Sequence, residues 1–167
     1  LNYNDEADSL LNELLRTDIS NGLLQTSVNV THAFVSSAIK EIPDFKLAST
    51  IYKDVYTSEF VTCMTIKDYW VWAYALNALG RKEEAQELIG QLTTEESSTT
   101  SYWQYMMAKS DNDLLSALTF LEDYIKYNDI EVSDALRQSL ALSQRDYFES
   151  QAELSEIAAE KSKLHLL

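Results

Sequence analysis

The sequence predicts an all-α protein, an α-α superhelix of helix hairpins with a long helix at its C-terminal end. Only three glycines and one proline occur in 167 residues of which 46% are hydrophobic, a balance that favours packed helices over β-sheets. An alanine followed by apolar residues four and seven positions later recurs four times, and this spacing places all three on one helical face. The alanines are separated by 41, 37 and 32 residues, a period typical of helical repeats. The four sets are Ala7/Leu11/Leu14, Ala48/Tyr52/Val55, Ala85/Ile89/Leu92 and Ala117/Leu121/Tyr124.

The first helix is expected to begin at Asn4 or Asp5, either of which can cap its N-terminus, and to end near Asn21 and Gly22. We interpret this helix as the second half of a hairpin.

The second hairpin is expected over 26–40 and 44–58, with Pro43 as the breaking residue and Asp44 as the start of its second helix. Several β-branched residues lower the helical propensity of its first helix.

The third hairpin has the clearest boundaries. It covers 67–79 and 81–92, and Gly80 between them can adopt the left-handed conformation that ends a helix. A polar loop over 93–101 follows, and a fourth hairpin is expected over 101–110 and 113–128.

Ser133 can cap a last helix for which no stop signal follows. The sequence therefore predicts helical repeats over 1–128 and a long capping or juxtamembrane helix over 129–167, in one continuous domain.

The segment 69–85 resembles a tetratricopeptide repeat. The family needs aromatic, apolar, small and glycine positions at fixed spacing, and Leu92 departs from its preference for alanine. The matching residues are Tyr69, Trp72, Ala73, Leu76, Gly80 and Ala85. The same frame fits the preceding and following units more loosely, and the resemblance covers about 1–128. It implies that the first helix of each hairpin lines a concave groove.

That groove is the candidate binding site. Its aromatic side chains beside three lysines could receive an extended acidic peptide or a carboxylate. The alternative interpretation is that Trp70 and Tyr74 pack in the core, which is common for aromatic residues at helical spacing. The residues on the expected face are Ala33, Ser37, Lys40, Lys67, Trp70, Tyr74, Asn77, Tyr102, Met106 and Lys109.

The C-terminal segments 124–129, 144–148 and 159–164 are similar to repeat-bearing regulators of Bacteroidetes-type bacteria. This resemblance implies an extracytoplasmic repeat array, connected by a long helix to a membrane segment beyond Leu167 and to a cytoplasmic signalling part. The last helix carries one weak seam at spacings of four and three, so a monomer or weak dimer is expected in isolation. The seam consists of Leu136, Leu140, Ser143, Tyr147, Gln151, Leu154, Ala158, Lys161 and His165.

Composition and motifs point away from nucleic-acid binding and catalysis. With 13 basic and 27 acidic residues the net charge is −14, which repels phosphate backbones. We expect the single cysteine, Cys63, to be a small buried residue. His32 and His165 are far apart in sequence, and the calcium-loop-like run 111–113 lacks the later glycine and glutamate. No catalytic residue, metal site or cofactor is therefore expected.

Three functions fit these observations. The first is a non-enzymatic, extracytoplasmic protein- or peptide-binding domain of a membrane-anchored bacterial regulator. The second is a soluble cytoplasmic chaperone or adaptor, since secretion chaperones with tetratricopeptide repeats are also small and acidic. An enzyme comes last, because its groove would need catalytic groups supplied by a partner.

Overall fold

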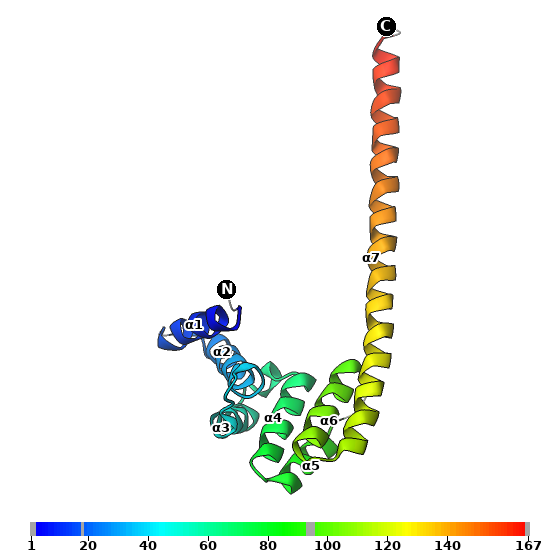
Figure 1. Ribbon diagram of the computed structural model, residues 1–167. Helices are drawn as coiled ribbons and strands as arrows, with labels where there is room; N and C mark the ends of the chain where they lie inside the picture. The colour runs from blue at the N-terminus through cyan, green and yellow to red at the C-terminus, as the bar shows by residue number, and fades with distance from the viewer. Residues whose placement is uncertain (1–2, 18, 93–95, 166–167) are drawn as a thin grey trace. The chain divides into compact units, whose positions relative to one another are not determined.

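The computed structural model describes residues 3–17, 19–92 and 96–165, with the backbone alone at 3–5, 7–8 and 157–165. Every regular element in these ranges is a helix, which confirms the all-α class (Figure 1). The α-helices are α1 (Tyr3–Arg16), α2 (Gly22–Phe34), α3 (Phe45–Tyr56), α4 (Ile66–Ala78), α5 (Lys82–Gly90), α6 (Ser98–Ser110) and α7 (Leu114–His165). A π-helix, η1 (Val35–Ile39), extends α2, and a 3-10 turn, η2 (Val61–Cys63), precedes α4.

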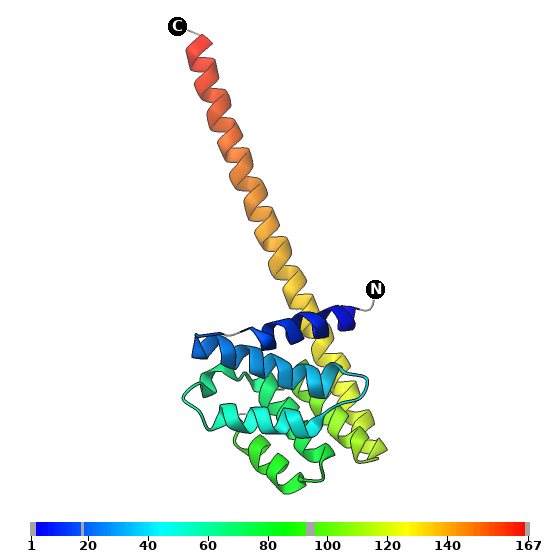
Figure 2. The ribbon, with the colours of Figure 1, turned by 90° about the vertical axis from the view of Figure 1, so that its left-hand side faces the viewer.

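The chain divides into a unit that ends at Tyr124 and a second unit that starts at Ile125. In the first unit each helix from α1 to α4 packs on the next, and α4 also contacts α2 and α6 (Figure 2). The second unit consists of the greater part of α7. In the residues that the structure describes, no helix has the length and apolar character needed to cross a membrane.

Capping residues set most helix starts. The Asp44 side chain accepts a hydrogen bond from the Leu47 amide at 2.9 Å, which confirms Asp44 as the cap of α3. The first helix ends earlier than expected, at Arg16, because Asn21 begins the next helix instead of ending this one. Its Oδ1 accepts hydrogen bonds from the amides of Leu23 and Leu24. An asparagine fits both roles, and its neighbours decide between them.

Gly80 ends α4 as expected. Its φ is +78°, in the left-handed region. This conformation lets the amide of Arg81 donate to the Leu76 carbonyl at 2.9 Å, so the last turn of the helix is satisfied by backbone groups. The turn brings α5 back against α4, which forms the hairpin that the sequence predicts at this position.

The first helix of the second hairpin does not stay α-helical to its end. It changes into the π-helix at Val35, where β-branched residues are frequent, and the Lys40 amide donates to the Val35 carbonyl. Ser37 is buried there, and its hydroxyl donates to the Ala33 carbonyl at 2.8 Å.

The expected break between 128 and 133 is wrong. Helix α7 runs without interruption from Leu114 to His165, a length of 52 residues. Asn128 and Ser133 are compatible with capping, but neither glycine nor proline lies near them to stop the helix. The sequence turns apolar at 164–167, and the side chains of this segment lie outside the described residues.

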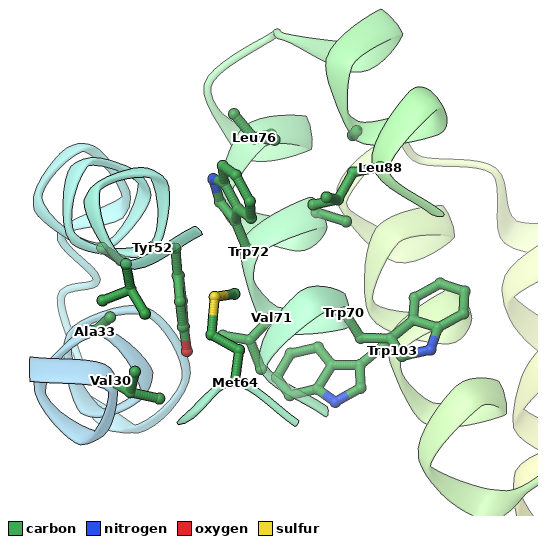
Figure 3. Packing of buried hydrophobic residues seen from close by; sticks show 14 residues of the cluster. Val30, Ala33, Tyr52, Met64, Trp70, Val71, Trp72, Leu76, Leu88 and Trp103 are labelled. Carbon is green, nitrogen blue, oxygen red and sulfur yellow. The ribbon is translucent and has the colours of Figure 1, made fainter. Parts of the chain in front are cut away.

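The core gathers around α4, which other helices contact on several sides. Trp70, Val71, Ala73 and Leu76 of this helix are buried together with side chains from α2, α3, α5 and α6 (Figure 3). Tyr52 stacks against Trp72 with ring centroids 6.4 Å apart. The core therefore joins the second, third and fourth hairpins through one helix.

The four predicted stripes are buried to different extents. Ala48, Ala85 and Ala117 are all buried, in agreement with close approach of neighbouring helices. In the first stripe Leu11 is buried with Val28, whereas Leu14 is 48% exposed. The side chain of Ala7 lies outside the described residues. Cys63 is half-buried and packs against the main core.

Tyr52 gives the fold a specific alkaline sensitivity. Its hydroxyl is buried without a hydrogen bond of good geometry, and burial, followed by the charge of Asp68, raises its pKa above the ordinary value of 10.0. Because the folded-state pKa is the higher one, this tyrosine's contribution to stability is complete below the ordinary pKa and is lost as the pH rises past it.

We therefore expect the unfolding free energy to fall less in Tyr52→Phe than in the wild type when the pH is raised from about 8 to about 11. The difference between the two proteins should grow by about 1.4 kcal/mol for each pH unit above the ordinary pKa. Urea denaturation at each pH measures this difference. Tyr147→Phe removes an exposed hydroxyl and is the matched control. Equal alkaline losses in the wild type and Tyr52→Phe would contradict the expectation.

Candidate aromatic binding face

A continuous series of aromatic rings connects α3, α4, α6 and the start of α7. We call Phe45, Tyr74, Trp103, Tyr102 and Tyr124 the aromatic path. Its four consecutive ring pairs have centroid distances of 5.4, 5.6, 5.1 and 5.6 Å. These distances are typical of edge-to-face and tilted aromatic contacts. Helices of three different hairpins therefore contribute to one surface, of which Trp103 is a buried part because it is only 5% exposed.

Positive charge lies near these rings at Lys109. The Lys109 Nζ lies 5.5 Å from the centroid of Tyr105, whose ring also contacts Tyr102. Burial and the neighbouring Tyr102 raise the pKa of Tyr74, and the charge of Lys109 opposes that shift. Lys109 is thus electrostatically coupled to two tyrosines of one cluster.

Lys67 lies in the first turn of α4, and its Nζ is 3.7 Å from the centroid of Phe34. This cation–π contact holds the ammonium group close to an apolar surface while the lysine side chain remains exposed. A carboxylate that approaches Lys67 would therefore meet a positioned charge.

The structure places some of the predicted groove residues on this surface and others in the core. Tyr74 and Met106 are half-buried, and Tyr102 is 36% exposed. Lys40 is half-buried at the end of the π-helix. Lys67 and Lys109 are exposed.

Trp70 and Asn77 do not contribute to an open groove. Trp70 is only 1% exposed, so the core interpretation applies to it. Asn77 is also buried, and its Nδ2 donates to Asp111 Oδ1 at 3.1 Å. The repeat pattern also places Ala33 and Ser37 on the groove, but both side chains are buried.

Sequence reasoning missed Phe45, Tyr105 and Tyr124 as members of this surface. Phe45 and Tyr74 are 29 positions apart, and no local pattern relates them. Helical spacing places Tyr124 in the stripe with Ala117 and Leu121. In the structure it is half-buried, and its ring contacts Tyr102. Its position in that stripe was the only available signal, because a residue at the edge of a stripe can also reach the adjoining face.

In the described ranges, no group of three or more His, Cys, Asp or Glu side chains could hold a metal ion. The buried Asp68 accepts hydrogen bonds from the Thr65 amide at 2.8 Å and from the Thr65 hydroxyl at 2.6 Å. Asp68 and Thr65 therefore form a helix cap, a structural role.

A scan of protein-family models and comparisons with curated proteins and with solved structures give no match to this chain.

Proposed function

We propose that this chain is a non-enzymatic binding domain whose aromatic path receives a protein or peptide segment. The observation that supports this most directly is the path itself, which extends over three hairpins and has Lys109 beside it. Aromatic rings provide contact area with little loss of side-chain entropy, and nearby lysines favour an acidic ligand. The tetratricopeptide resemblance fits Tyr74, Tyr102 and Trp103, which lie on the first helix of a hairpin. Phe45 and Tyr124 lie on second helices.

The proposed setting is the extracytoplasmic sensing or scaffold part of a membrane-anchored bacterial regulator of the Bacteroidetes type. The resemblance of segments 124–129, 144–148 and 159–164 to such regulators supports this setting. The long helix α7 would then carry the binding event toward a membrane segment. The acidic composition favours the second candidate, a cytoplasmic chaperone or adaptor. The sequence of the full-length gene distinguishes the regulator from the chaperone or adaptor. An apolar run of about 20 residues after Leu167 is expected only for the regulator.

Binding at the aromatic path can be tested with an extended acidic peptide. A blocked, labelled peptide of alternating glutamate and proline remains extended, and its prolines can pack on aromatic rings. We expect Tyr102→Ala and Lys109→Glu each to weaken its binding about tenfold, because each removes one favourable contact of a ligand along the path. Fluorescence anisotropy measures the affinity.

Two matched controls separate local from general effects. Lys46→Glu makes the same charge change on exposed α3 surface, and Tyr147→Ala truncates an exposed tyrosine of α7. Both variants should bind as the wild type does. If Lys46→Glu weakens binding as much as Lys109→Glu, the peptide responds only to net charge and the proposal fails.

A further inference from the structure

A cavity that none of the path residues lines lies among α4, α5, α6 and the start of α7. Its volume is about 280 Å³, which is enough for one large side chain. Trp70, Met107 and Phe120 provide its apolar wall, and Asp111 and Asp113 are exposed at its edge. It therefore combines apolar and acidic surface.

Trp70 in this wall has an unusual polar group. The indole Nε1 is buried and has no hydrogen-bond partner in the described structure, whereas the Nε1 of Trp72 donates to Ser49 at 3.3 Å. A buried donor without an acceptor is costly. Because Trp70 lines the cavity and its Nε1 is buried, the indole N–H reports on changes in the packing of this wall.

The two carboxylates at the edge retain capacity for a cation. Asp111 Oδ1 accepts from Asn77, and it lies 2.8 Å from the Lys82 Nζ. Asp113 caps α7 by accepting hydrogen bonds from the amide and the hydroxyl of Ser116. Hydrogen bonds from Ser116 lower the pKa of Asp113, so this exposed carboxylate is ionised at neutral pH. Each carboxylate has about four acceptor sites, of which these contacts use two.

We propose that this cavity binds an arginine residue of a basic partner segment. The residue has the two required parts: a methylene stem for Met107 and Phe120, and a guanidinium group for the two carboxylates. Guanidinium groups pair well with carboxylates. The net charge of −14 attracts a basic segment at long range. This ligand is opposite in charge to the one proposed for the aromatic path.

The probe is the blocked peptide Ala-Ala-Arg-Ala-Ala, compared with the same peptide carrying citrulline, which keeps the shape of arginine but lacks its charge. A proton–nitrogen correlation spectrum resolves the three indole N–H signals, and Trp70→Phe assigns that of Trp70. We expect the arginine peptide to shift the Trp70 signal in a saturable manner. The citrulline peptide should bind at least about tenfold more weakly, as expected for loss of charge-assisted hydrogen bonds.

Asp113→Asn tests the carboxylate without removing the helix cap, because asparagine caps as well as aspartate does. Asp44→Asn makes the same change at the cap of α3 and is the matched control. Asp113→Asn should weaken the arginine peptide about tenfold and Asp44→Asn should not. The proposal is overturned if the Trp70 signal does not respond up to the solubility limit of the peptide. Equal binding of the citrulline peptide, or equal effects of the two variants, would also overturn it. None of these outcomes depends on the acidic peptide or on Lys109.

Discussion

Trp70→Ala is expected to destabilise the protein by about 3 to 5 kcal/mol, the usual range for removal of a buried aromatic side chain. Trp70 is among the largest fully buried side chains, and it lies in the core that joins α4 to its neighbours. The variant loses the apolar contacts of the indole and leaves a cavity in the middle of the fold. Urea denaturation monitored by circular dichroism measures the change in unfolding free energy.

The outcome also decides between the two interpretations of this tryptophan. Tyr147→Ala, which truncates an exposed aromatic residue, should change stability by no more than about 0.5 kcal/mol. If Trp70→Ala behaved like this control, and weakened the binding of the acidic peptide instead, Trp70 would belong to the binding surface.

Ala85→Leu is expected to destabilise the protein by about 1 to 3 kcal/mol, because three added carbon atoms must fit where helices already touch. Ala85 is completely buried in the second helix of the clearest hairpin. The larger side chain would force α5 away from α4 or into a strained conformation. The denaturation midpoint reports this effect.

Ala141→Leu is the matched control for this overpacking, since it makes the same substitution at an exposed position of α7. Its stability should stay within about 0.5 kcal/mol of the wild type. A midpoint for Ala85→Leu equal to that of Ala141→Leu would show that the small residue is not needed for close helix packing. The assignment of Ala85 to a helix contact of the repeat would then be wrong.

The aromatic path and the cavity use adjoining parts of one face of α4, because Tyr74 of the path and Trp70 of the cavity wall are four positions apart. Their neighbours differ. Tyr74 contacts rings of α3 and α6, whereas the cavity around Trp70 includes Met107 and the start of α7. Two ligands of opposite charge can thus be proposed for one unit without competition for the same side chains.

Features that depend on a few neighbouring residues can be predicted from the amino-acid sequence. The all-α class follows from composition, and Asp44 and Gly80 mark a helix start and a helix end through their own hydrogen bonding and φ angle. The buried alanines Ala48 and Ala85 follow from helical spacing, because a small residue between apolar ones predicts a contact face.

Which residues form a surface depends on how the helices pack against one another. Helical spacing places Trp70, Tyr74 and Asn77 on one face, yet Trp70 and Asn77 are buried because neighbouring helices approach α4 on several sides. The contact of Phe45 with Tyr74 depends on how two helices pack. A spacing pattern records the direction in which a side chain leaves its own helix, and burial depends on what the rest of the chain places in that direction.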